Sequence, residues 1–305
     1  MAVVDPVVMR RLKQFHPERI LFGYLFDLSV IALAIAITLQ SYWFYPIAIF
    51  VIAARQHGMG VLMHEGVHFL IFKNKKLNDA VTRYFLSLPL FISMKHFRSQ
   101  HLAHHAHTND PVHDPDWARR LKLDGWIFPM SPSHLFSIFL KDFFLLNTFE
   151  MVQRFSGQQS HVGARLTWME FITTLLYYSV VAFVLFHFHI FHLFLLFWVL
   201  PMLMPLKVIR RIRGISEHHG MVVLGTRTVI GSKFDRFFLS PWNINLHIEH
   251  HRFPQVPCFG LTELHECLMK DSEFKKTAAI YPDYYSVYKE CTRPIESPSL
   301  TCVST

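Results

Sequence analysis

Four apolar segments of this chain are each long enough to cross a lipid bilayer. A transmembrane helix needs about 20 mostly apolar residues, and we place spans at about residues 21–39, 43–63, 166–186 and 188–206. Only 17% of the residues are charged, against about 25% in soluble domains. The sequence therefore predicts an all-α, polytopic membrane protein whose four transmembrane helices pair as two hairpins.

Two shorter apolar segments do not meet this requirement. Residues 84–94 and 135–149 carry charges or prolines, so we expect interfacial or re-entrant helices there, with a fifth crossing as the alternative. The second span is expected to continue as a helix beyond Ala54 into a polar stretch.

Positive charge predicts the orientation of the spans, because cytoplasmic flanks are enriched in Lys and Arg. Basic residues precede the first span, follow the second and follow the fourth, whereas the hairpin tips at 40–42 and 187–189 have neither Lys nor Arg. We therefore expect both termini in the cytoplasm, with residues 64–165 and 207–293 forming a cytoplasmic helical cap. Residues 1–293 then make a single domain, and the Ser/Thr-rich segment 294–305 is a loose tail.

Histidine is the second unusual feature. The chain has 21 histidines, against roughly seven at ordinary usage. Eight of them fall in the motifs HEGVH, HLAHH and HIEHH, which contribute His64, His68, His101, His104, His105, His247, His250 and His251. Side chains three or four positions apart share one face of a helix, so each motif can direct its imidazoles at one point. The predicted topology brings all three motifs to the same side of the membrane.

Eight imidazoles exceed the three or four protein ligands of a single metal, so two metals in one site is the simpler interpretation. A ninth ligand is expected from His218 or His219, which follow the fourth span. Imidazole suits iron, copper, zinc and nickel, while magnesium and calcium prefer oxygen. Iron is favoured because a redox-active pair beside a lipid phase suits oxidation of C–H bonds by dioxygen; spacing alone leaves copper and zinc open.

The order and spacing of the motifs resemble the membrane fatty acid desaturase and hydroxylase superfamily. The resemblance covers about residues 20–270 and includes Asp114-Pro115-Asp116 after the second motif and Asn245 and Phe253-Pro254 around the third. It implies a non-haem di-iron oxidase that uses O2 as co-substrate and a separate electron donor, a ferredoxin or a cytochrome b5 with its reductase. The implied substrate is an acyl chain carried by CoA, an acyl carrier protein or a phospholipid, with no role for nucleic acid.

Carried over position by position, the resemblance makes the eight motif histidines and His218 the metal ligands. Asn245, Asp114 and Asp116 are candidates for orienting ligand imidazoles, although Asn245 also suits a helix cap and the aspartates a turn. Some acyl desaturases have an Asn that contacts the metal through water at a position that is Gly214 here.

Desaturation of an acyl chain is the favoured activity, because residues 247–265 look most like the acyl-lipid desaturase branch. Hydroxylation, acetylenic-bond formation and carotenoid oxidation use the same ligand set and stay open. The cell membrane of a bacterium or the endoplasmic reticulum is the expected location. The four cysteines all lie in the predicted cytoplasmic part of the chain, so no disulfide is expected.

Two other functions compete with the oxidase. HEGVH also fits H-E-x-x-H, the zinc protease motif with Glu65 as general base, and Leu123-Asp124-Gly125 resembles an intramembrane protease motif. That interpretation leaves HLAHH and HIEHH unexplained. A metal transporter needs polar groups along its spans, but the four spans carry almost none. Asp27 and Glu170 are expected near span ends, where they reach the interface.

Overall fold

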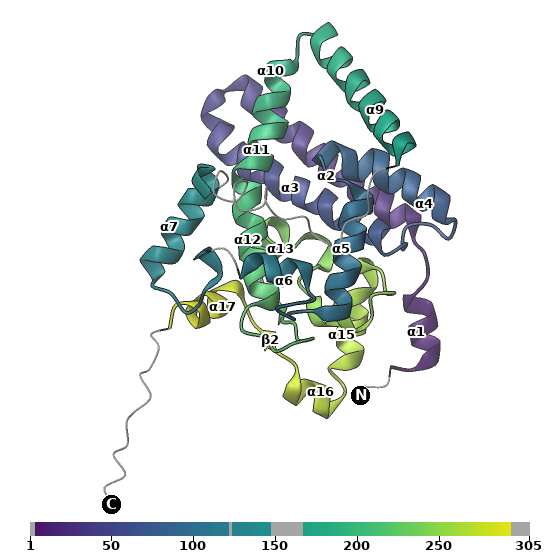
Figure 1. Ribbon diagram of the computed structural model, residues 1–305, viewed down its shortest axis with the longest axis vertical. Coiled ribbons are helices and arrows are strands. Elements are labelled where there is room, and N and C mark those ends of the chain that lie inside the picture. Colours follow the sequence, from purple (N-terminus) through teal and green to yellow (C-terminus); the bar gives the residue numbers. More distant parts are fainter. Residues whose placement is uncertain (1–3, 122–123, 148–166, 294–305) are drawn as a thin grey trace, which may run out of the picture.

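The computed structural model describes residues 4–121, 124–147 and 167–293 of the chain. Within them the regular structure is mostly helical, as expected from the sequence (Figure 1). A short parallel ladder, in which β1 (Thr228–Val229) pairs with β2 (Ile280–Tyr281), is the only sheet among the described residues.

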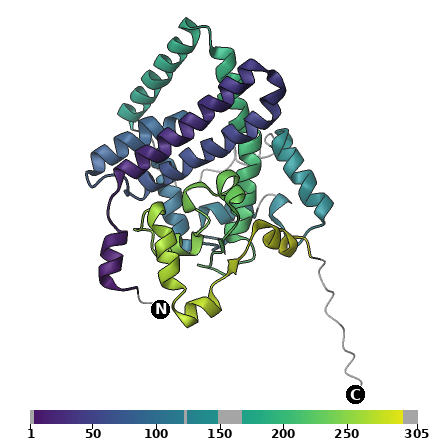
Figure 2. The ribbon, with the colours of Figure 1, turned by 180° about the vertical axis from the view of Figure 1, so that it is seen from behind.

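Four helical segments are long and apolar enough to cross a membrane, at Pro17–Gln40, Tyr42–Val67, Trp168–His187 and Phe191–His218. This confirms the number and approximate positions of the predicted spans. The first is α2 (Pro17–Gln40) and the second is mainly α3 (Tyr45–Val67), joined by the 3-10 turn η1 (Tyr42–Phe44). Both views show α2 and α3 side by side (Figures 1 and 2). As expected, α3 runs unbroken through the polar stretch into the first histidine motif.

The fourth span is interrupted and extends well beyond residue 206, where the sequence placed its end. It consists of α10 (Phe191–Phe194), the π-helical turn η5 (Leu195–Val199), α11 (Leu200–Leu203) and α12 (Pro205–His218). Pro201 and Pro205 lack the N–H that an unbroken helix would use, which accounts for breaks near these positions. The arginines of α12 end the apolar pattern but not the helix, so α12 delivers His218 directly.

The third span, α9 (Trp168–His187), has no buried residue. It begins at a capping box between Thr167 and Glu170 and diverges from α10 beyond their connecting turn (Figure 1). Near its start, the guanidinium of Arg83 donates to the Glu170 carbonyl at 2.6 Å and to the Thr173 hydroxyl at 2.7 Å. The exposed face of α9 is therefore available to lipid.

Among the described residues, neither of the two shorter apolar segments forms a helix that is long and apolar enough to cross a membrane. Residues 84–94 fall mainly in η2 (Thr82–Ser87) and η3 (Leu88–Leu90), which follow α4 (Lys75–Val81). Residues 135–147 lie in and just after α7 (Pro132–Phe143), an amphipathic helix that buries Leu135 and Ile138. Residues 148 and 149 of that segment lie outside the described residues.

The remaining elements gather on the side of the α2–α3 pair that is opposite the turn between α9 and α10 (Figures 1 and 2). They are α1 (Pro6–Leu12), α5 (Met94–His107), α6 (Pro115–Arg120), η4 (Asp124–Trp126), α13 (Lys233–Phe238), η6 (Pro241–Asn243), α14 (His247–Arg252), η7 (Cys258–Gly260), α15 (Leu261–Leu268), α16 (Ser272–Thr277) and α17 (Tyr284–Cys291). Their core, centred on Leu246, Leu261 and Leu264, packs α14 against α15.

A buried ion pair ties this helical part to the first two spans. Asp27 of α2 is fully buried and lies 3.1 Å from Arg55 of α3, so the expectation that Asp27 reaches the membrane interface is wrong. The second carboxylate oxygen accepts a 3.0 Å hydrogen bond from the Trp242 indole in η6, and Arg55 also donates to the Phe237 carbonyl. A Cβ at position 58 would lie 2.5 Å from the Asp27 carboxylate, so glycine is required there.

Removing Asp27 alone should destabilise the protein strongly. The Asp27→Ala variant leaves Arg55 buried without its counter-ion, which costs about 3–5 kcal/mol in comparable pairs. We expect a clearly lowered thermal unfolding midpoint in detergent by scanning fluorimetry, and a substantial recovery in the double variant Asp27→Leu/Arg55→Met. An unchanged midpoint for Asp27→Ala would show that the pair does not hold these helices together.

Candidate metal centre

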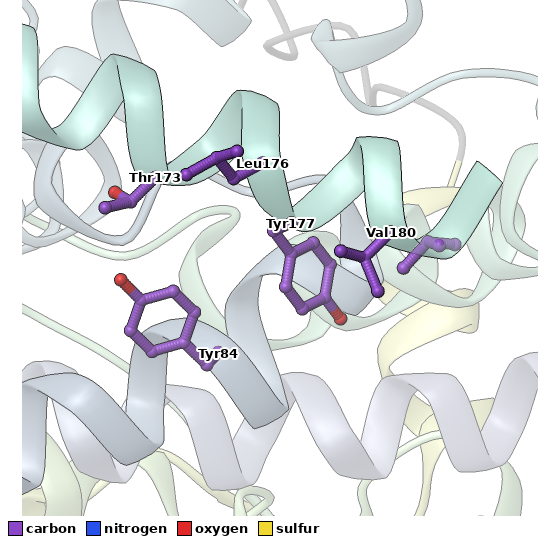
Figure 3. A pocket seen from close by; sticks show the side chains of 6 residues that line it. Tyr84, Thr173, Leu176, Tyr177 and Val180 are labelled. Carbon is purple, nitrogen blue, oxygen red and sulfur yellow. The ribbon is translucent and has the colours of Figure 1, made fainter. Parts of the chain in front are cut away.

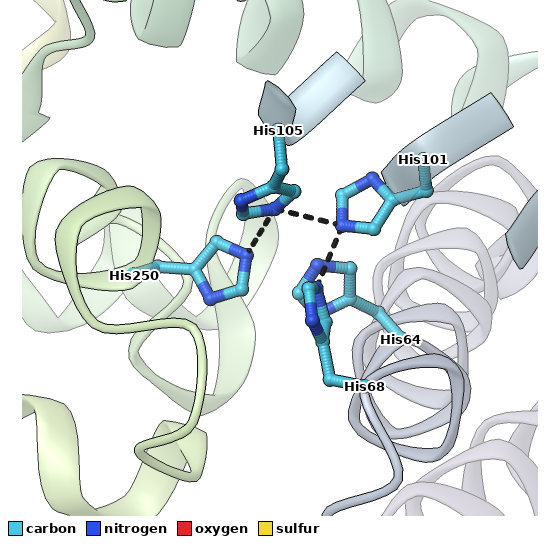
Figure 4. A group of neighbouring side chains, drawn as sticks. All are labelled: His64, His68, His101, His105 and His250. Carbon is cyan, nitrogen blue, oxygen red and sulfur yellow. Dashed lines mark hydrogen bonds between the residues drawn. The ribbon is translucent and has the colours of Figure 1, made fainter. Parts of the chain in front are cut away.

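Five of the predicted histidines converge from three helices that are far apart in the sequence. His64 and His68 come from the end of α3, His101 and His105 from α5, and His250 from α14 (Figure 4). Each offers a ring nitrogen, and these five atoms all lie within 4.8 Å of one another. We call this set the five-histidine group.

The nitrogen spacing in this group matches that expected around a metal ion. The Nε2 atom of His101 lies 2.9 Å from that of His68 and 3.0 Å from that of His105, which in turn is 3.0 Å from that of His250. Two nitrogens bound at right angles with bonds of about 2.1 Å are separated by about 3.0 Å. One Nε2 has a single in-plane position for a proton or lone pair, so hydrogen bonding alone satisfies these contacts poorly.

The environment of His64 also indicates a metal ion in this group. Both of its ring nitrogens are buried and have no hydrogen-bond partner among the described residues. A buried polar atom without a partner costs free energy, and a shared cation would supply the missing interaction. The five-histidine group therefore fits a metal ion by its donor set as well as by its spacing.

The other predicted ligands form a second group next to the first. His104, His218 and His251 place donor atoms within 4.8 Å of one another, and so do Glu217, His218 and His247. His218 joins the two triplets, with its Nε2 3.0 Å from that of His247. The ring of His251 stacks on that of His105, with centroids 4.1 Å apart. We call His104, His218, His247 and His251 the four-histidine group.

Burial lowers the pKa of several of these imidazoles and so favours the neutral form, which is the form that binds metals. It lowers the pKa of His68 to about 4, with a further contribution from Arg98. It lowers the pKa of His105 to about 2, helped by the nearby His68 and His104. Burial likewise lowers the pKa of His101, His247, His250 and His251 well below the usual range.

Asp114 orients His104. Its Oδ2 atom accepts a 2.8 Å hydrogen bond from His104 Nδ1, which leaves Nε2 of that ring as the metal donor. The same oxygen also accepts from the Asn109 backbone N–H, and Oδ1 caps α6 through the N–H groups of Asp116 and Trp117. Asp114 thus fixes the direction of one ligand relative to two helices.

The other proposed orienting residues contact different partners. Asp116 pairs with Arg119 at 2.6 Å, and the Asn245 amide donates to the carbonyls of Val229 and Ile230. Gly214 has no side chain to reach a metal, and the space beside it is occupied by Trp126 and Arg120. Asn245 therefore fixes the loop that precedes the third motif, and no contact of Asp116 with a ligand imidazole is found among the described residues.

The glutamates of the first and third motifs hold the helices that carry the histidines in place. The Glu65 carboxylate accepts a 2.8 Å hydrogen bond from the Cys258 backbone N–H, which connects α3 to η7. Glu249 is fully buried; it accepts from His265 of α15 at 2.7 Å and from the Thr228 hydroxyl at 2.6 Å. Both carboxylates thus cross-link separate segments.

Several residues that contact the candidate metal ligands were not identified from the sequence. Glu217 lies 3.6 Å from His247 Nε2, and Thr108 lies 3.2 Å from His251 Nδ1. Glu217 directly precedes His218, so an acidic residue beside a candidate ligand was a usable signal. The partnership of Glu249 with His265 had no such signal, because it joins two helices through tertiary packing.

Histidines outside the two groups have other environments. His219 is only partly buried and packs on Phe128, with ring centroids 4.2 Å apart, so His218 is the member of the pair that faces the site. His107 pairs with His113 in an exposed turn. His187 stacks on Phe183 at the end of α9, a helix that contributes no residue to either histidine group.

A groove of about 340 Å³ lies between η2 and α9. Tyr84 faces Tyr177, with Thr173, Leu176, Val180 and Val181 on the same side of α9 as Tyr177 (Figure 3). The groove is almost entirely apolar apart from the two phenol hydroxyls and the threonine. One of its walls is the span α9, whose exposed face is available to lipid, so an apolar chain suits the groove better than a polar ligand.

Asp114→Asn should weaken metal binding with little change in fold. Asn can keep the cap on α6, but its amide N–H2 facing His104 favours the tautomer with the proton on Nε2, which removes the lone pair. We expect about 10–100-fold weaker metal binding in competition with a chelator. Asp116→Asn, which alters a carboxylate paired with Arg119, should bind metal normally; equal affinities in the two variants would contradict the role given to Asp114.

Comparison with known proteins agrees with this geometry. The family model described as "Fatty acid desaturase" matches residues 40–283. Dihydrorhizobitoxine desaturase of Bradyrhizobium elkanii is 26% identical over 294 residues, covering 89% of this chain and 82% of that protein. Zeaxanthin 4-ketolase of Chlamydomonas reinhardtii is 26% identical over 207 residues, which are 67% of this chain but only 40% of the ketolase. The chain is therefore a membrane protein that belongs to the fatty acid desaturase family.

Proposed function

We propose that this protein is an O2-dependent oxidase that desaturates a lipid-like, preferably fatty acyl, chain at a di-iron centre. The observation that supports it most strongly is the convergence of nine histidines in two adjacent groups. Family membership supports the oxidoreductase class, and a relative named as a desaturase supports the reaction type. All-nitrogen ligation in each group suits iron.

The proposed reaction balances with one external donor. Two C–H bonds on neighbouring carbons break and one C=C bond forms, which releases two electrons and two protons. A ferredoxin, or a cytochrome b5 with its reductase, supplies two more electrons, two protons come from water, and O2 is reduced to two water molecules. Bound iron would supply the activation of O2, which organic side chains do not provide.

The chain's own residues position the reactants. The five-histidine and four-histidine groups would each hold one iron, and Asp114 keeps one ligand in the required tautomer. Five of the nine histidines are buried, which would limit the access of bulk water and thereby unproductive reduction of O2. We place part of the apolar substrate chain in the groove between η2 and α9.

We also propose that both ends of the described chain and the histidine groups lie on the cytoplasmic side of the membrane. The Lys- and Arg-rich flanks favour a cytoplasmic position for α1, for α17 and for the histidine groups. Such an orientation lets a soluble electron donor reach the site from the cytoplasm of a bacterium or from the cytoplasmic face of the endoplasmic reticulum.

Oxygen insertion is the second candidate reaction. The relative named zeaxanthin 4-ketolase shows that a 26% identical sequence is associated with ketone formation, and a hydroxylase would use the same ligand groups. Product mass separates the two reactions. The protease interpretation is disfavoured, because Glu65 is bonded to the Cys258 backbone and all three histidine motifs meet at one place.

Turnover should give a product lighter by two hydrogen atoms. We expect this mass change when purified, iron-loaded protein is supplied with O2, a reduced ferredoxin and acyl substrates that differ in carrier, followed by mass spectrometry. His68→Ala should abolish it, because the five-histidine group loses a ligand, whereas His187→Ala should retain it. A product heavier by one oxygen atom would favour hydroxylation, and full activity of His68→Ala would refute the shared site.

Filling the groove should change substrate selection. Val180→Trp adds bulk where an apolar chain is proposed to lie, so we expect a higher KM for long acyl chains than for short ones at normal iron content. Val184→Trp, on an exposed stretch of α9 that does not line the groove, is the matched control. Identical kinetics in the two variants would remove the groove from the substrate path.

A further inference from the structure

A cluster of four arginines lies beside the four-histidine group. Arg119 and Arg120 end α6, while Arg210 and Arg213 lie on α12. Arg119 is paired with Asp116 at 2.6 Å, and Arg213 is paired with Glu217 at 2.6 Å. Two members of the cluster thus have direct counter-ions.

Arg120 and Arg210 do not. Within the described residues, neither guanidinium lies within 4.0 Å of a carboxylate oxygen. Both are nevertheless near Asp116: burial raises the pKa of that carboxyl, but the guanidinium groups of Arg119, Arg120 and Arg210 outweigh burial and leave its pKa below the usual value. Asp114 and Glu217 are also close enough to act on Arg120. The oxygens of Asp114 already accept from His104 and three backbone N–H groups, and Glu217 is paired with Arg213.

Gly214 fixes where Arg120 lies relative to the metal site. A Cβ at position 214 would be 3.1 Å from the Arg120 guanidinium and 2.9 Å from the Trp126 ring. The Arg120 guanidinium is itself 4.7 Å from the centre of that ring. Gly214 is one helical turn before His218 on α12. Because Gly214 has no side chain, the guanidinium of Arg120 can lie one turn away from His218, a candidate metal ligand.

The guanidinium groups of Arg120 and Arg210 can still be reached by a ligand. Arg120 is half-buried and Arg210 is exposed. Arg120 and Arg210 are close enough for their positive charges to repel each other, and a bound anion in direct contact with both would relieve that repulsion. The planar fork of Arg suits carboxylate and phosphate, which it can bind through two parallel hydrogen bonds.

We propose that Arg120 and Arg210 bind the anionic group of the substrate. The inference rests on the proposed function and narrows the substrate class to amphiphiles with a carboxylate or phosphate, held so that the charged end lies beside the four-histidine group. A neutral hydrocarbon or a neutral ester of the same length should bind less well. The source of the anion is either a free acid or a phospholipid headgroup, which share this chemistry.

The test is equilibrium binding to the full-length, iron-loaded protein in neutral detergent. Radiolabelled palmitate and hexadecan-1-ol have the same chain length and differ in charge, and phosphatidylglycerol supplies the lipid-borne anion. Wild type should bind palmitate or phosphatidylglycerol about tenfold or more tightly than hexadecan-1-ol, and whichever anion is preferred identifies the source. Arg120→Gln and Arg210→Gln should each lose about tenfold in affinity for that anion and none for the alcohol.

Two controls make the result decisive. Arg10→Gln removes the same charge from the exposed face of α1 and should bind like wild type. Protein stripped of iron by a chelator should retain the preference for the anion, since the guanidinium groups and not the metal hold it. If the Arg120→Gln variant is depleted of iron, the binding affinity of the Arg210→Gln variant decides whether the arginines bind the anion, because Arg210 is exposed.

Equal affinity of wild type for palmitate, phosphatidylglycerol and hexadecan-1-ol would overturn the proposal, and so would loss of the preference in stripped protein. Normal binding by both Arg120→Gln and Arg210→Gln would also overturn it. Turnover is not measured in this experiment, so a failure of the anion site leaves the proposed oxidation standing. A failure of oxidation, conversely, appears only in the product analysis.

Discussion

Nine imidazoles held close together, five of them buried, are the constraint on which the rest of this structure depends. Their lone pairs converge, and several buried ring nitrogens have no hydrogen-bond partner among the described residues. Such an arrangement is unfavourable unless cations occupy the points of convergence. The helices that carry the candidate ligands must then be held in position relative to one another to within about 0.5 Å.

The means of fixing them are distributed over the molecule. The ion pair of Asp27 and Arg55 joins α2 to α3 and reaches Trp242, five residues before His247. Glu65 joins α3 to η7, and Glu249 joins α14 to α15. Buried charged groups therefore connect the helices that carry the histidine groups to one another and to their neighbours.

Much of this was predictable from the sequence. The four spans follow from long apolar segments, and the histidine motifs follow from helical spacing, because both patterns are local. The length of α12 was missed, since Arg210, Arg211 and Arg213 end the apolar pattern while the helix continues to His218. The buried state of Asp27 was missed for a different reason: its partner Arg55 is on another helix, and only packing brings the two together.

The same limit applies to the site. Whether His218 or His219 faces the site depends on how α12 is rotated about its axis where it ends at His218. The sequence does not specify that rotation. The bond from Asp114 to His104 spans a turn of ten residues and was inferred only through resemblance, and the arginine cluster requires α6 and α12 to meet. Contacts of this kind depend on tertiary structure, so composition and spacing do not reveal them.

The central claim is that two adjacent histidine groups hold a pair of irons. The most direct measurement is the metal content of purified protein by plasma mass spectrometry, combined with Mössbauer spectroscopy, for wild type, His250→Ala and His104→Ala. We expect about two irons per chain in a coupled pair, with iron lost from both variants. A single zinc per chain, retained in His250→Ala, would contradict the shared di-iron site and return attention to Glu65.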